Sequence, residues 1–125
     1  MRPGFRWDTA DAFLFDIDGT LLNSRDAVHY FAFRTAIRDV LGIEASIEGV
    51  PVHGNTDVGI LRAVLQRAGL QNGAIDAHMH QIVHRMCAEV QQNREQLNPE
   101  LCPSIPELIA HLQAQGKLVA AASGN

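Results

Sequence analysis

Two short apolar runs stand near the two ends of the chain, and each ends at polar turn residues. Residues 12–15 read Ala-Phe-Leu-Phe and are followed by Asp16, while Leu118 to Ala122 is followed by Ser-Gly-Asn. Unbroken apolar runs of this length predict strands buried on both faces, as in a parallel sheet. The Asp18-Gly19-Thr20 stretch after the first run has the composition of a turn.

Between the two runs, apolar residues recur with a helical period. A first helix is expected to follow Ser24 as its N-cap and to end near Leu41, with Gly42 at C′. A second is expected to begin after Asn55 or Thr56 and to stop at Gly69. The apolar stripe of the first helix is expected to include Val28, Phe31, Thr35 and Arg38, flanked by Ala32, Ala36 and Val40.

Two further helices follow. One is expected from about Ala74 to Asn93, and another is expected to run through Gln115 behind a capping box of Ser104 and Glu107. The order is therefore strand, three helices, helix, strand, which indicates the α/β class and a parallel crossover. In such sheets, sites gather beyond the carboxyl ends of the strands.

Composition and charge narrow the classes of function. The 125 residues carry 10 Lys and Arg against 14 Asp and Glu, with no basic block, so nucleic acid is not an expected partner. Two cysteines in a chain of this size indicate a reducing, cytoplasmic setting. The apolar runs are too short to span a bilayer, so no membrane partner is expected. The sequence leaves the oligomeric state open.

The aspartates at the end of the first strand are the leading candidate for chemistry. Asp16 and Asp18 alternate, so both side chains can point toward one small space. Two carboxylates so close repel each other unless a cation or a shared proton lies between them, and Mg²⁺ suits oxygen ligands. One carboxylate can attack phosphorus and the other can transfer protons. The alternative interpretation is that two aspartates simply cap a loop after a strand.

The string FLFDIDGTLLNS, residues 13–24, resembles the first motif of the haloacid dehalogenase-like hydrolases, most of which are Mg²⁺-dependent phosphatases. The resemblance implies a Rossmann-like parallel sheet core, of which two strands are present, with an inserted α-helical cap. It makes Asp16 the nucleophile and Asp18 the general acid and base. Both would also bind Mg²⁺, Asp18 through its backbone carbonyl, and Thr20 would support the phosphate-binding loop.

A second motif of this family resembles KLVAAASGN, residues 117–125. It implies that the Ser123 hydroxyl and the Gly124 backbone N–H bind phosphate oxygens, as small residues at a strand-to-helix turn permit. The resemblance divides the chain into core (1–22), helical cap (23–99) and core (100–125). In the cap, HGNTD at residues 53–57 is interpreted as a helix cap in preference to an anion-binding loop.

The chain departs from the family pattern in its later motifs. The Lys and the additional Asp residues that complete the family's site have no counterpart, since the single Lys, Lys117, precedes the second strand. We therefore expect an N-terminal part of a longer protein, with little catalysis by residues 1–125 alone. The favoured function is hydrolysis of a small phosphorylated metabolite, in the phosphoglycolate phosphatase-like branch. A phosphomutase and a non-catalytic phosphate- or partner-binding fragment are the alternatives.

His80 and His84 are spaced for one helix face, as in some zinc sites. Without a clear third ligand, the favoured interpretation is a solvated helix face.

Overall fold

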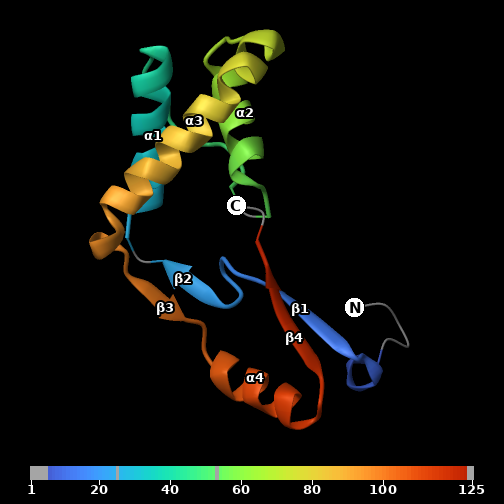
Figure 1. The fold of residues 1–125 in the computed structure, drawn as a ribbon. Coiled ribbons are helices and arrows are strands. Elements are labelled where there is room, and N and C mark those ends of the chain that lie inside the picture. Colours follow the sequence, from blue (N-terminus) through green and yellow to red (C-terminus); the bar gives the residue numbers. More distant parts are fainter. Residues whose placement is uncertain (1–5, 25, 53, 124–125) are drawn as a thin grey trace. The chain divides into compact units, whose positions relative to one another are not determined.

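The computed structural model describes residues 6–24, 26–52 and 54–123 (Figure 1). The chain divides into two compact units. The sheet unit contains residues 6–24 and 99–123, and the helical unit contains residues 26–52 and 54–98. The elements are η1 (Trp7–Thr9), β1 (Ala12–Asp16), β2 (Leu22–Ser24), α1 (Val28–Leu41), α2 (Asp57–Arg67), α3 (Asn72–Gln92), η2 (Arg94–Gln96), β3 (Pro99–Leu101), α4 (Ile105–Ala114) and β4 (Leu118–Ala122).

The centre of the sheet unit is a parallel pair of strands, β1 and β4 (Figure 1). Their register runs from Ala12 opposite Leu118 to Asp16 opposite Ala122. Helix α4 precedes β4 and buries Leu112 completely. The parallel strand–helix–strand skeleton and the α/β class expected from the sequence are both confirmed.

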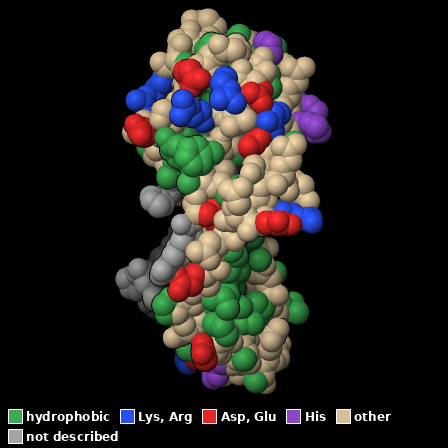
Figure 2. Space-filling model, turned by 90° about the vertical axis from the view of Figure 1, so that its left-hand side faces the viewer, with side chains coloured by type: hydrophobic (Ala, Val, Ile, Leu, Met, Phe, Trp, Pro, Cys, Tyr) green, Lys and Arg blue, Asp and Glu red, His purple; other side chains and the backbone are tan. Residues whose placement is uncertain are grey.

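The expectation that these strands are buried on both faces is wrong for the described chain. Leu14 and Leu118 are each 71% exposed, whereas Phe13 and Phe15 are half-buried. Side chains alternate between the two faces of a strand, and only one face of this two-stranded pair is covered. Figure 2 shows hydrophobic side chains gathered on the surface of the sheet unit.

A second, antiparallel pair of strands was not predicted. Strand β2 pairs with β3, with Leu22 opposite Leu101 and Ser24 opposite Pro99. Ser24 therefore belongs to a strand and is not the N-cap of α1, as expected from the sequence. The N-cap residue of α1 is Ala27, and the preceding Asp26 accepts the backbone N–H of Val28 through its Oδ1 at 3.0 Å.

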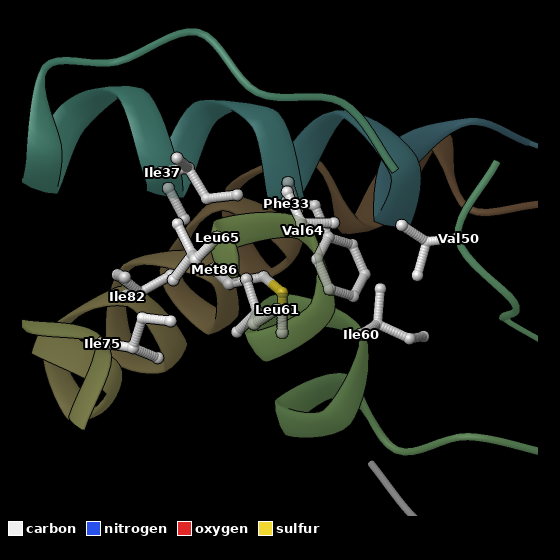
Figure 3. Close-up of a cluster of buried hydrophobic side chains, with 12 residues drawn as sticks. Phe33, Ile37, Val50, Ile60, Leu61, Val64, Leu65, Ile75, Ile82 and Met86 are labelled. Carbon is white, nitrogen blue, oxygen red and sulfur yellow. The ribbon is translucent and has the colours of Figure 1, made fainter. Parts of the chain in front are cut away.

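The helical unit has its own hydrophobic core, in which side chains from α1, α2 and α3 interlock (Figure 3). Leu61, Leu65 and Ile75 are fully buried there. On α1 the predicted stripe is wrong in part, because Phe33 and Ile37 form the buried face while Phe31 is 54% exposed. The core cluster consists of Ala32, Phe33, Ala36, Ile37, Val50, Ile60, Leu61, Val64, Leu65, Ile75, Ile82 and Met86.

The residues that begin and end the helices agree with two of the predicted caps and differ from a third. Helix α1 ends at Leu41 and is followed by Gly42, which is left-handed with φ 67°, as expected. Thr56 caps α2 by accepting the Gly59 N–H at 3.1 Å, also as expected. The predicted capping box on α4 is wrong. Ser104 is itself left-handed, with φ 62°, and makes no side-chain cap hydrogen bond. Side-chain capping is typical of an extended N-cap backbone, which Ser104 does not have.

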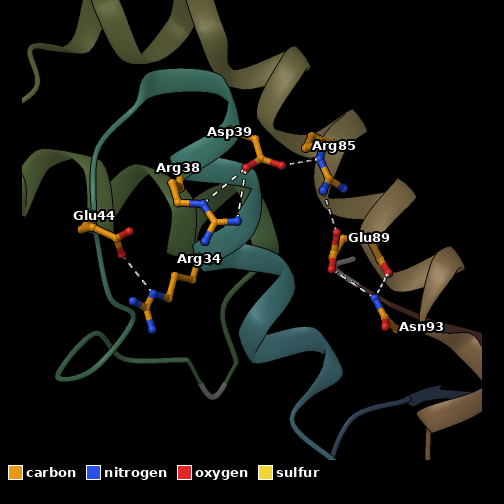
Figure 4. A network of polar contacts seen from close by, with 7 residues as sticks. All are labelled: Arg34, Arg38, Asp39, Glu44, Arg85, Glu89 and Asn93. Carbon is orange, nitrogen blue, oxygen red and sulfur yellow. Dashed lines mark hydrogen bonds and ion pairs between the residues drawn. The ribbon is translucent and has the colours of Figure 1, made fainter.

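An ion pair joins α1 to α3 on the surface of the helical unit (Figure 4). The guanidinium of Arg85 binds Glu89 at 2.7 Å and Asp39 at 2.9 Å. Hydrogen bonds to these carboxylates, Glu89 foremost, hold the pKa of Arg85 above its ordinary value. Arg85 therefore links α3 to the last part of α1.

None of the helices in the described part of the chain combines the length and the apolar character needed to cross a bilayer.

Candidate active site

Asp16 and Asp18 lie on either side of Ile17, where β1 ends and a tight turn begins. The Ile17 carbonyl accepts the backbone N–H groups of Thr20, Leu21 and Leu22 at 2.9–3.2 Å. Gly19 has φ 75°, a conformation that favours glycine, and it donates its N–H to the Leu22 carbonyl at 2.8 Å. The Asp-Gly-Thr sequence therefore folds into a hydrogen-bonded turn directly after the strand.

The strand register brings the second motif to the same edge of the sheet. Asp16 lies opposite Ala122, so Ser123 is the first residue after β4 at the end where Asp16 completes β1. Gly124, the other candidate for phosphate binding, lies outside the described residues. The structure thus brings the first motif and Ser123 to the carboxyl edge of one parallel pair, where sites form in sheets of this kind.

The side chains at this edge are accessible to a solute. Asp16, Asp18 and Ser123 are exposed, and Thr20 is half-buried in the turn. Carboxylate and hydroxyl oxygens at one edge offer both a nucleophile and hydrogen-bonding groups for a phosphate ester.

The oxygen donors suit Mg²⁺ in type but form a partial set. Asp16 and Asp18 offer carboxylates, and Asp18 also offers a main-chain carbonyl, all of which are hard ligands. Within residues 6–24, 26–52 and 54–123, no three or more His, Cys, Asp or Glu side chains are grouped as a metal site would require. The two aspartates could hold a magnesium ion only together with further ligands.

Lys117 lies at the opposite end of the strand pair from the aspartates. It precedes Leu118, which pairs with Ala12 at the start of β1, and its Nζ donates to the Asp8 carbonyl at 3.2 Å. In the described part of the sheet unit, Lys117 therefore lies away from the two aspartates.

In the helical unit, Thr56 and Asp57 of the HGNTD stretch have structural partners. Thr56 caps α2, as preferred from the sequence, and His53 lies outside the described residues. The Asp57 carboxylate lies 3.0 Å from Nε2 of His29, a contact that sequence analysis missed. His80 and His84 are exposed, which confirms the solvated helix face.

This chain is similar to three solved structures that share its fold, each less than 25% identical to it in sequence. A predicted phosphoglycolate phosphatase from Haemophilus somnus 129pt matches with a TM-score of 0.56 and 22% identity, covering 91% of this chain and 51% of that one. A putative phosphatase from Clostridium difficile matches with a TM-score of 0.53 and 15% identity, covering 91% and 49%. A family IA, variant 3 hydrolase from Entamoeba histolytica HM-1:IMSS matches with a TM-score of 0.55 and 18% identity, covering 90% and 48%.

The chain spans about half the length of each of these three structures. No curated protein matches it. The family model for haloacid dehalogenase-like hydrolases matches residues 10–125, which include both motifs at the edge of the sheet. The chain therefore belongs to the haloacid dehalogenase-like hydrolase family.

Proposed function

We propose that this protein is a Mg²⁺-dependent phosphatase that hydrolyses a small phosphorylated metabolite through a phosphoaspartate on Asp16. The observation that carries the proposal is the placement of Asp16, Asp18 and Ser123 at one edge of the β1–β4 pair, in a chain of a hydrolase family. Two structural neighbours, a predicted phosphoglycolate phosphatase and a putative phosphatase, support the same reaction class.

The reaction divides into two steps at the two aspartates. In the first, an oxygen of the Asp16 carboxylate attacks phosphorus while Asp18 gives a proton to the leaving oxygen of the ester. In the second, Asp18 takes a proton from a water molecule that attacks the phosphoaspartate. Phosphate leaves and the Asp16 carboxylate is restored. Bound Mg²⁺, held by the Asp16 carboxylate and the Asp18 carbonyl, would neutralise negative charge on the phosphoryl group.

The remaining residues of the edge would orient the phosphate. The Ser123 hydroxyl and the Gly124 N–H would donate hydrogen bonds to its oxygens, and Thr20 would support the turn that carries Asp18. We assign residues 23–99 as the helical cap of the family, a segment suited to selecting the substrate. The site is expected to work in the cytoplasm on a soluble metabolite.

A non-catalytic role in binding phosphate or a partner is the second candidate. It is favoured by the donor set, because no group of three or more metal-ligating side chains is found in the described residues. Such a protein would bind phosphate at the same edge without turnover.

The experiment compares Mg²⁺-dependent phosphate release from an aryl phosphate by three proteins, each expressed from the complete coding sequence. They are the wild type, Asp16→Asn and Asp11→Asn. Asp11 is an exposed aspartate just before β1, at the end of the strand away from the site, and so provides a matched control. We expect Asp16→Asn to reduce the rate by roughly 10³-fold or more, because the amide is a poor nucleophile, and Asp11→Asn to retain it.

Turnover by the Asp16→Asn variant at the wild-type rate would remove Asp16 from the mechanism. Phosphate binding by a wild type that shows no turnover with any phosphate ester would favour the second candidate.

A further inference from the structure

Two segments connect the helical unit to the rest of the chain, one entering it after Ser24 and one leaving it before Pro99. In the β2–β3 ladder these two residues are opposite each other and form its last pair. Proline has no backbone N–H, so Pro99 cannot donate a further hydrogen bond to the ladder. The nearest preceding donor on the leaving segment is the N–H of Asn98.

The side chain of Asp26 accepts that hydrogen bond. Its Oδ2 lies 2.7 Å from the Asn98 nitrogen, a contact between residues 72 positions apart, while its Oδ1 accepts the Val28 N–H at 3.0 Å. One carboxylate therefore holds both the first turn of α1 and the segment that follows η2. Hydrogen bonds to an ionised carboxylate are stronger than those between neutral groups.

The helical unit is hollowed beside Asp26. A hollow of about 180 Å³ lies between the start of α1 and the end of α3, and Asp26 forms part of its wall. Beside it, Phe31 is 54% exposed, so this side chain is not packed into the core. Asp26 therefore makes its two hydrogen bonds at the edge of this hollow. The hollow is lined by Asp26, Ala27, Val28, Phe31, Glu89, Asn93 and Gln96.

We propose that Asp26 is a clamp that fastens the two ends of the helical unit to each other. With the clamp in place, the segment that enters the helical unit and the segment that leaves it are held together. Without it, the segment around Asn98 is free to separate from α1 while the core of the unit stays folded. This inference is independent of the chemistry proposed for Asp16 and Asp18.

Amide hydrogen exchange of the protein, expressed from its complete coding sequence, tests the clamp in the wild type, Asp26→Ala and Asp26→Asn. We expect Asp26→Ala to increase exchange at Asn98 by roughly tenfold or more, since its charge-assisted hydrogen bond is lost. Exchange at Ile37, in the core of the same unit, should stay unchanged. Trypsin should also cleave faster after Arg94, an exposed residue of the leaving segment.

The Thr56→Ala variant is the matched control. The Thr56 side chain likewise accepts a backbone N–H at the start of a helix of this unit, but its hydrogen bond, to Gly59, is local to α2. We expect Thr56→Ala to increase exchange at Gly59 and to leave Asn98 unchanged. Asp26→Asn keeps the shape of the side chain but has one acceptor oxygen in place of two, so it should speed exchange at Asn98 or at Val28 even if Asp26→Ala fails to fold.

Unchanged exchange at Asn98 in both Asp26 variants would overturn the proposal. An equal increase in amide exchange at Asn98 and Ile37 would also overturn it. Asp26 would then stabilise the whole helical unit and not only the contact between its two end segments.

Discussion

Asp16 is the register partner of Ala122, the last residue of β4, in the parallel pair. This relationship places the turn after β1 and the Ser123 that follows β4 at the same end of the sheet. The two family motifs come from opposite ends of the chain and meet because parallel strands present their carboxyl ends together. The proposed phosphatase site depends on this arrangement, because it combines Asp16 and Asp18 of the first motif with Ser123 of the second.

The role of Asp18 predicts a specific kinetic defect. Asp18→Asn should lower the steady-state rate of aryl phosphate hydrolysis by roughly 10²- to 10⁴-fold, because it removes the general acid and base. A good aryl leaving group needs little protonation, so the first step should suffer less than the second. Rapid-quench measurements should then show a burst of released aryl alcohol followed by slow turnover. A steady-state rate equal to that of Asp11→Asn would contradict the role of Asp18.

Two glycines of the helical unit, Gly42 after α1 and Gly73 in α3, predict opposite effects of substitution by Ala. Gly42 has φ 67°, so Gly42→Ala should lower the free energy of unfolding by about 1 kcal/mol. Gly73 lies in the first turn of α3 with open space around its Cα, so Gly73→Ala should raise it by up to about 1 kcal/mol. Urea unfolding followed by circular dichroism measures both. Equal effects of the two substitutions would show that the left-handed conformation of Gly42 is not strained by a side chain.

The core of the helical unit predicts a contrast between two residues of α2. Leu61 is fully buried, so Leu61→Ala should cost about 2–5 kcal/mol of unfolding free energy through lost burial and a cavity. Val58 is 43% exposed on the same helix, and Val58→Ala should cost less than about 1 kcal/mol. The same unfolding experiment compares the two. Similar losses at both positions would contradict the packing seen in Figure 3.

Local sequence signals were sufficient where one residue decides a boundary. Gly42 follows the end of α1 because its own backbone adopts the left-handed conformation. Thr56 caps α2 because its side chain reaches an N–H only three residues away. The buried face of α1 was harder to predict. Both Phe31 and Phe33 are apolar, and which of them is buried depends on where α2 and α3 pack.

The β2–β3 pair could not be read from the sequence for a related reason. Each strand has three residues, too few for a period-2 pattern, and the partner of Ser24 is the distant Pro99. The sequence around Ser24 therefore predicts a helix cap, because a serine gives the same local signal at a helix N-cap and in a three-residue strand.

The candidate site was more predictable than its surroundings. The edge shared by Asp16 and Ser123 follows from two apolar strands and the rule for parallel sheets. The contact between His29 and Asp57 had no such signal, because it depends on the packing of α1 against α2. From the sequence, Asp57 is expected only to place a favourable negative charge in the first turn of a helix.

The most direct test of the account is to trap the phosphoryl group on Asp16. The Asp18→Asn variant, expressed from its complete coding sequence, would be mixed with an aryl phosphate and Mg²⁺, quenched in acid and digested with trypsin for mass spectrometry. The account predicts a phosphorylated peptide covering residues 7–25 with the modification on Asp16, and none when Asp16→Asn is added to the variant. Release of the aryl alcohol without phosphate on Asp16, or with phosphate on another residue, would contradict it.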